Sequence, residues 1–334
     1  MIEPGRGLGP VIRLAPAKLN LTLAIVGRRP DGFHALHSIM APLGLADRLS
    51  LDLADGGQDT LFVAAGDAEL EVLGPAADNL VLRAIAAARV ALGGGRPAPA
   101  LAARLEKRIP VAAGLAGGSS DAAAALDGAL EAWGAGGTSV LSAEERLRIA
   151  ARLGSDVPFF LAGGLALVEG RGERVSPLPK AISGEPPGVL LVVPRIAVPT
   201  PAVFAAYAAS GVPINGATRL TSDHLAGELQ RGLTARTLHD RAGILASAND
   251  LAAASAAVAP AIVPFRRALA RLTGRPIGLS GSGPSLWILY PSLEMARAAE
   301  AVVRRSLDAG ALVAPGDGPP FVAATPIDAD RVPR

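Results

Sequence analysis

The stretch Ile109–Asp121, which reads IPVAAGLAGGSSD, constrains the fold of this chain more than any other part of the sequence. Pro110 ends a predicted strand, three glycines follow, and an alanine-rich run with apolar residues three and four positions apart then predicts a helix. Glycine lets the backbone approach a ligand closely, and the first turn of a helix offers unpaired N–H groups and the positive end of its dipole. The stretch therefore predicts a strand, a phosphate-binding loop and a helix N-terminus in succession.

The same residues also suit an ordinary turn, because Ser119, Ser120 and Asp121 are typical of an N-cap and a first helical turn. The loop is neither a Walker loop nor a G-x-G-x-x-G loop. Its order, P-x-x-x-G-L-x-G-G-S-S, resembles the phosphate loop of the GHMP kinases, which include galactokinase and the homoserine, mevalonate and phosphomevalonate kinases. This resemblance favours phosphate binding. It implies that ATP is bound by Pro110, Val111, Ala112, Ala113, Gly114, Leu115, Ala116, Gly117, Gly118, Ser119 and Ser120.

Composition excludes several classes of function. A length of 334 residues favours two domains, and the absence of cysteine excludes disulfides and thiolate chemistry. The formal net charge is only +2 and the basic residues are scattered, so no nucleic-acid partner is expected. The N-terminus lacks a signal-like apolar segment, and the longest apolar stretch is short and broken by proline. We expect a cytoplasmic protein without membrane contact, either a monomer or a weak homodimer.

Apolar and polar residues alternate over Val11–Val26, which predicts a half-buried strand with Lys18 and Asn20 on its polar face. Lys18 is one of only three lysines among 32 basic residues. A chain this rich in arginine keeps a lysine mainly where a compact point charge differs usefully from a planar guanidinium. We interpret Lys18 as functional, with a solvated strand lysine as the alternative.

Two other segments carry candidate side chains. Arg29–His34 reads RPDGFH, a turn that presents Phe33 and His34 together, although such a pair alone is more typical of packing. Asp156 precedes Val157-Pro158, a pattern typical of a helix N-cap with proline in the first turn. A carboxylate fixed at a helix start is also well placed to receive a proton, so both interpretations of Asp156 remain open.

Proline and glycine concentrate between residues 177 and 188, which predicts a boundary between an N-terminal domain, 1–180, and a C-terminal domain, 181–334. Before the boundary we expect short strands at Leu49–Leu53 and Leu61–Ala64. Beyond it, strands and helices alternate as two βαβ-like halves, which suggests a split, ferredoxin-like α+β domain.

Further motifs extend the resemblance over most of the chain: A-K-L-N-L…R-x-D-G-F-H, L-G-S-D-V-P-F-F, P-T-P-x-x-F and L-S-G-S-G-P-S. The first resembles the opening of the GHMP kinases that recognise cytidine in non-mevalonate isoprenoid synthesis. The resemblance implies an α+β fold with an N-terminal ribosomal-protein-S5-like domain and a C-terminal ferredoxin-like domain. It also implies transfer of the ATP γ-phosphoryl group to the 2-hydroxyl of 4-diphosphocytidyl-2-C-methyl-D-erythritol, with Mg²⁺ as a cofactor.

The resemblance assigns roles at the reaction centre. Asp156 would orient the acceptor hydroxyl and take its proton, and Lys18 would keep Asp156 ionised and stabilise charge on the transferred group. Ser119 or Ser120 would be the protein contact of Mg²⁺. The implied substrate-binding residues are Asn20, Phe33, His34, Thr200, Phe204, Gly281 and Ser282. Of these, Phe33 and Phe204 would stack on the cytosine while His34 reads its edge.

Two positions depart from the family pattern. Ala116 stands where glycine is common, which bears on the loop geometry, and Phe33 stands where tyrosine is frequent. Two alternatives remain: another small-molecule GHMP kinase, of the homoserine or mevalonate type, or a nucleotide-binding sensor without catalysis. An aromatic pair able to frame a base argues against the first, and the presence of both Lys18 and Asp156 argues against the second.

Overall fold

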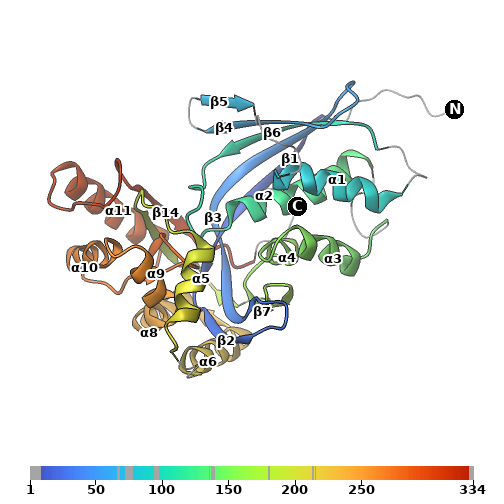
Figure 1. The fold of residues 1–334 in the computed structure, drawn as a ribbon. Coiled ribbons are helices and arrows are strands. Elements are labelled where there is room, and N and C mark those ends of the chain that lie inside the picture. The colour runs from blue at the N-terminus through green and yellow to red at the C-terminus, as the bar shows by residue number, and fades with distance from the viewer. Residues whose placement is uncertain are drawn as a thin grey trace.

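The computed structural model describes residues 9–65, 68–71, 78–93, 98–134, 136, 140–179, 181–212, 214 and 216–330, and two sheets organise them (Figure 1). The larger sheet has the strand order β5-β4-β6-β3-β7-β8, with β1 and β2 also paired to β3. Only β4 and β6 run parallel within the described part of this sheet. Its strands are β1 Val11–Asn20, β2 Ala24–Arg28, β3 His34–Leu53, β4 Thr60–Ala65, β5 Ala68–Glu71, β6 Leu101–Lys107, β7 Ala166–Gly170 and β8 Arg174–Pro177.

Strand β3 spans 20 residues and pairs with four other strands, so the short strand predicted at Leu49–Leu53 is only its last part. Figure 1 shows β3 running through the molecule from the β4–β6 end toward β2 and β7. Glycine is required at position 44 inside this strand, because a Cβ on Gly44 would lie 2.8 Å from ring atoms of Pro326. Leu45 N–H donates to Thr325 Oγ1 at 2.8 Å. Strand β3 therefore also contacts β14, Phe321–Pro326, which is an edge strand of the second sheet.

Four helices cover one face of the larger sheet (Figure 1). Their apolar faces bury Leu49, Leu101, Ala122, Leu126 and Phe159 in one continuous core, and this burial is the main stabilising contribution to this half. They are α1 Leu80–Leu92, α2 Gly117–Ala132, α3 Ala143–Leu153 and α4 Val157–Ala162.

The second sheet is antiparallel, with the order β12-β13-β10-β14, and α10 and α11 pack on it. The observed strand and helix order confirms the α+β fold expected for this half. Its strands are β10 Gly188–Val193, β12 Gly278–Leu279, β13 Leu286–Tyr290 and β14 Phe321–Pro326; β9 Ile182–Ser183 and β11 Leu233–Thr234 form a separate pair. Its helices are α5 Thr200–Ala209, α6 Ala217–Arg231, α7 Ala235–Asp240, α8 Ala242–Ser247, α9 Ala252–Val258, α10 Ile262–Thr273 and α11 Leu293–Asp308.

The hydrophobic core continues from one sheet to the other. Leu19 and Ile39 of the larger sheet share a buried cluster with Leu191 and Trp287 of the smaller one. The division between residues 180 and 181 therefore stays a prediction. None of the described helices is long and apolar enough to cross a membrane.

The single half-buried strand predicted over Val11–Val26 is wrong in two respects. The strand breaks because Leu23 leaves β3: its N–H donates to Ala248 O at 2.8 Å and its carbonyl accepts from Asp250 N–H at 2.9 Å. The polar face is also buried, with Lys18 only 4% and Asn20 only 2% exposed, because segments from the second half of the chain cover it.

Candidate active site

Lys18 lies near the end of β1, and its ammonium group is fixed from several directions. Nζ donates to Asn20 Oδ1 at 2.6 Å and to Gly114 O at 3.0 Å, and it lies 4.0 Å from Asp156 Oδ2. Burial lowers the pKa of Lys18, and the Asp156 carboxylate opposes this shift. A solvated strand lysine is excluded by this burial, and the site holds a desolvated cation beside a carboxylate.

Asp156 stands at the start of α4, in the N-cap position, with Pro158 in the first turn. Within the described part of the chain its side chain makes no capping hydrogen bond, and the carboxylate is 29% exposed. The structure thus gives no support to the helix-cap interpretation. The carboxylate is placed beside Lys18 and open to a ligand.

The glycine loop joins β6 to α2, as predicted. Lys18 N–H donates to Leu115 O at 3.0 Å, which ties the loop to the end of β1. Helix α2 begins at Gly117, so the N–H groups of its first turn are available to an anion. Ala116 has φ 54° and Ala112 φ 55°, left-handed conformations that cost alanine about 1–2 kcal/mol each. The alanine at position 116 therefore does bear on the loop geometry.

An acidic pair holds the base of this loop, and the sequence interpretation missed it. Lys107 Nζ donates to Asp121 Oδ2 at 2.7 Å and also to Asp47 Oδ2. Asp47 Oδ1 accepts the N–H groups of Arg108 and Ile109. Burial raises the pKa of Asp121 to about 7, although Lys107 opposes the shift. The one available signal was that Lys107 is another of the three lysines.

The segment Leu279–Ser285 closes against the glycine loop. Ser280 Oγ donates to Gly114 O at 3.0 Å, and Ser285 N–H donates to Ala113 O at 3.2 Å. A Cβ at Gly281 would lie 3.4 Å from Lys18 Nζ, so this glycine stands directly beside the buried ammonium. The two predicted loops and Lys18 therefore form one site.

Two further contacts fix this segment. Thr200 Oγ1 and Ser282 Oγ share a hydrogen bond of 2.8 Å, which brings together two predicted substrate-binding residues. Asn249 Nδ2 donates to the carbonyls of Leu279 and Gly281 at 3.0 and 2.9 Å. Asn249 therefore has a structural role at the site.

The predicted aromatic residues lie at the start of β3, where Phe33 precedes His34, and in the middle of α5, which carries Phe204. His34 stacks on Phe204 with ring centroids 5.3 Å apart, and it meets Tyr207 edge-on. Burial and the nearby Arg28 lower the pKa of His34, so the imidazole is neutral at pH 7 and offers one donor and one acceptor nitrogen. Phe33 is 50% exposed under the Arg171 guanidinium. Tyr207 was missed, although it follows Phe204 by three positions on one helix face.

Ser119 and Ser120 differ in their surroundings. Ser120 is 1% exposed, its hydroxyl has no partner among the described residues, and it lines a cavity of about 420 Å³ with Arg13 and Asp127. Ser119 is half-buried, and its Oγ lies 3.8 Å from where a Cβ of Gly154 would be, close to the segment that carries Asp156. No group of three acidic or histidine side chains in the described chain could hold a metal by itself.

Comparison with known proteins places this geometry in a class. Residues 79–164 match the family model described as the GHMP kinases N terminal domain. A homoserine kinase from Cytophaga hutchinsonii superimposes with a TM-score of 0.68 over 100% of this chain and 99% of its own, at 18% identity, so it shares the fold. The fold, the glycine loop and the family match over residues 79–164 define the protein as a GHMP kinase.

Relatives with higher sequence identity identify one particular family within the GHMP kinases. The 4-diphosphocytidyl-2-C-methyl-D-erythritol kinase of Pelotomaculum thermopropionicum is 36% identical over 89% of this chain and 94% of its own length. A crystal structure of 4-(cytidine 5'-diphospho)-2C-methyl-D-erythritol kinase superimposes with a TM-score of 0.65 at 29% identity, covering 94% of this chain and 99% of that one. The chain belongs to the 4-diphosphocytidyl-2-C-methyl-D-erythritol kinase family.

Proposed function

We propose that this protein transfers the γ-phosphoryl group of ATP to the 2-hydroxyl of 4-diphosphocytidyl-2-C-methyl-D-erythritol, in the methylerythritol phosphate pathway to isoprenoid precursors. The observation that carries the proposal is the 4.0 Å approach of the Lys18 ammonium to the Asp156 carboxylate beside the glycine loop, in a chain of this family. Phosphoryl transfer has a loose transition state, so the protein contributes mainly positioning and charge stabilisation.

Asp156 acts as the general base. Its carboxylate takes the proton of the substrate hydroxyl while the hydroxyl oxygen bonds to the γ-phosphorus and ADP leaves. Lys18 is held by Gly114 O and Asn20 Oδ1, so its position is fixed before the substrate arrives. A desolvated ammonium stabilises the charge of the transferred group more strongly than a solvated one.

The ATP phosphates lie against the loop, where the N–H groups of Gly117, Gly118 and Ser119 open α2. Mg²⁺ fits this site, because it commonly binds through substrate phosphates with only one or two protein oxygens. The half-buried Ser119 hydroxyl, near the Asp156 segment, is the better contact, since Ser120 faces a different cavity. When bound, Mg²⁺ neutralises charge on the phosphates.

The cytosine is read by the aromatic group. Its faces stack on Phe33 and Phe204, and a neutral His34 offers a ring nitrogen to its polar edge. Because His34 lies on Phe204 in this structure, stacking of the base on Phe204 requires the imidazole to leave that ring. Asn20, Thr200, Gly281 and Ser282 contact the remainder of the substrate. Finer parts of this proposal are a cytoplasmic location, a monomer or weak homodimer, and no nucleic-acid partner; the scattered basic residues and the net charge of only +2 support the last of these.

ADP release tests the proposal, with 4-diphosphocytidyl-2-C-methyl-D-erythritol, homoserine and mevalonate compared as acceptors under identical conditions. We expect ADP release to depend on the cytidine substrate alone. Equal or faster turnover with homoserine or mevalonate would replace this function by that of another GHMP kinase. ATP binding without turnover of any acceptor would identify a nucleotide-binding sensor.

A further inference from the structure

The turn between β7 and β8, residues 171–173, contacts two parts of the proposed site at once. On one side its backbone presses against the segment before Asp156: a Cβ at Gly172, which has φ 128°, would lie 2.2 Å from Ser155 O. Only glycine permits this approach. The turn is thereby fixed relative to the catalytic carboxylate.

Arg171 extends from this turn to the base-binding residues. Its guanidinium lies 5.3 Å from the centroid of the Phe33 ring, a cation–π distance. Nη2 of the same group donates to Ala151 O at 2.8 Å, near the C-terminal end of α3. A planar guanidinium can stack on a ring and donate in its own plane together, which an ammonium cannot. Arg171 therefore links the otherwise exposed Phe33 to the helix that leads to Asp156.

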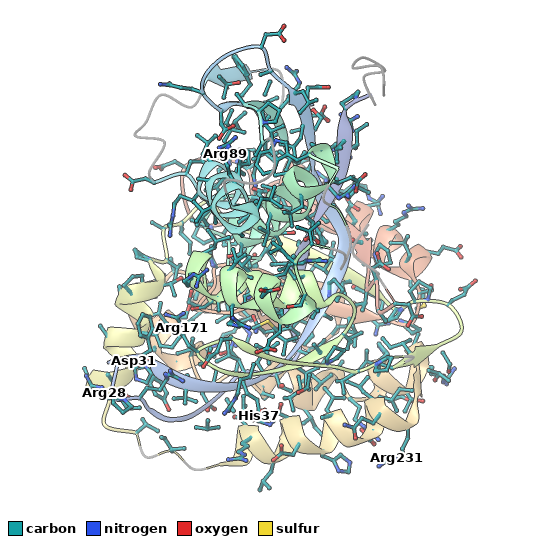
Figure 2. The ribbon with its side chains drawn as sticks, turned by 90° about the vertical axis from the view of Figure 1, so that its right-hand side faces the viewer. Arg28, Asp31, His37, Arg89, Arg171 and Arg231 are labelled. Atoms are coloured by element: carbon teal, nitrogen blue, oxygen red, sulfur yellow. The ribbon has the colours of Figure 1, made fainter. Side chains whose placement is uncertain are left out.

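A second set of contacts joins the loop that carries Phe33 to the β7–β8 turn. Arg29 Nη1 donates to Glu173 Oε1 at 3.1 Å, and Arg29 Nη2 lies 3.0 Å from Asp31 Oδ2. Asp31 Oδ1 in turn accepts the N–H of Phe33 at 3.2 Å. Figure 2 shows Arg171, Asp31 and Arg28 grouped at one corner of the molecule, away from Arg89. The Phe33 backbone and ring are thus both tied to the β7–β8 turn.

We propose that Arg171 is a positioning residue for substrate specificity: it holds the Phe33 ring in place to stack on the pyrimidine and fixes that ring relative to Asp156. This inference rests on the proposed function, because it requires a base at Phe33. It assigns Arg171 no contact with the substrate.

Cytidine and cytidine diphosphate distinguish this role from direct phosphate binding. Both ligands are titrated by calorimetry against the full-length protein and its Arg171→Met, Arg171→Lys and Arg174→Met variants. Arg174, on the same hairpin and 67% exposed, is the matched control. A lost cation–π contact predicts about two- to fivefold weaker binding of both ligands by Arg171→Met. Arg171→Lys should recover part of the loss, and Arg174→Met should resemble the wild type.

The same comparison is repeated in a Phe33→Leu background, where Arg171→Met should cause no further loss because the ring it positions is gone. Steady-state kinetics of the single Arg171→Met variant should show a higher KM for the cytidine substrate, with kcat and the KM for ATP unchanged. Weaker binding of cytidine diphosphate with unchanged cytidine binding would overturn the inference in favour of a phosphate contact. Unchanged binding of both ligands would overturn it outright while leaving the proposed function intact. A wild-type protein that binds neither ligand would overturn both.

Discussion

Lys18 and Asp156 place an ammonium nitrogen and a carboxylate oxygen 4.0 Å apart, across the end of β1 and the start of α4. This distance is too long for a direct hydrogen bond but short enough for strong electrostatic attraction in a buried site. The ammonium instead donates to Asn20 Oδ1 and Gly114 O. The carboxylate consequently remains available to a substrate hydroxyl while the ammonium stays beside it.

Asp156→Asn keeps the shape of the side chain and removes the proton acceptor. We expect kcat to fall by about two to four orders of magnitude, with the affinities for ATP and cytidine diphosphate nearly unchanged. The side chain caps no described N–H group, but the exchange leaves the buried Lys18 ammonium without the adjacent carboxylate, so the melting temperature should fall and kcat is measured well below it. Turnover near the wild-type rate would remove Asp156 from the mechanism.

The burial of Lys18 predicts how kcat depends on pH in the alkaline range. Burial lowers its pKa, so the ammonium loses its proton, and kcat should fall, at a pH below the ordinary lysine value of 10.5. A buried lysine is less costly to the fold when neutral, so its deprotonation does not destabilise the protein. The loss of activity should therefore precede unfolding when kcat and melting temperature are measured together against pH.

Lys18→Arg is the companion variant. It should lose most activity, because the larger fork does not fit beside Gly281, and overpacking this buried position costs about 1–3 kcal/mol of stability. Any residual activity should lack the alkaline loss, since arginine stays charged. A fully active Lys18→Arg enzyme would contradict the assigned role.

Gly118→Ala separates phosphate binding from turn geometry. A Cβ at Gly118 meets nothing closer than Leu80 Cδ1 at 3.8 Å, and alanine favours a helix over glycine by about 1 kcal/mol. We expect unchanged or higher stability together with about tenfold weaker ATP binding, because the methyl group obstructs approach to the helix N–H groups. Gly227→Ala within α6 is the control. Unchanged ATP affinity in Gly118→Ala would favour the turn-only interpretation.

Asp121 predicts a pH dependence of stability. Burial raises its pKa from the ordinary value of 3.8 to about 7, so the folded protein binds a proton that the unfolded chain releases. Asp121 therefore lowers the free energy of unfolding as the pH rises from 3.8 to about 7. Asp121→Asn does not titrate. Urea unfolding at several pH values should show the variant gaining stability relative to the wild type up to about pH 7; a constant difference would contradict the assignment.

Local patterns account for what the sequence predicted. The glycine loop followed by α2, and the helix start at Asp156, depend on contacts between near neighbours in the chain, so residue type and spacing indicate them. The order of strands and helices around β13 and α11 was predictable for the same reason.

Long-range contacts account for what it did not predict. Strand β3 continues through position 44 because Gly44 leaves room for the Pro326 ring, which is distant in the sequence. The break between β1 and β2 results from the backbone pairing of Leu23 with Ala248 and Asp250. The cluster around Lys107 likewise joins three separate elements. No spacing rule within one segment encodes such contacts.

Recognition of the cytosine is the central claim, and titration with cytidine and uridine diphosphates tests it most directly. Base–aromatic stacking is worth roughly 1–3 kcal/mol, so Phe204→Ala should weaken cytidine diphosphate binding by about one to two orders of magnitude with ATP binding almost unchanged. His34→Ala should in addition reduce the discrimination between cytidine and uridine, because the base edge distinguishes them. If neither variant changed the affinity for cytidine diphosphate, recognition of the base by His34 and Phe204 would be contradicted.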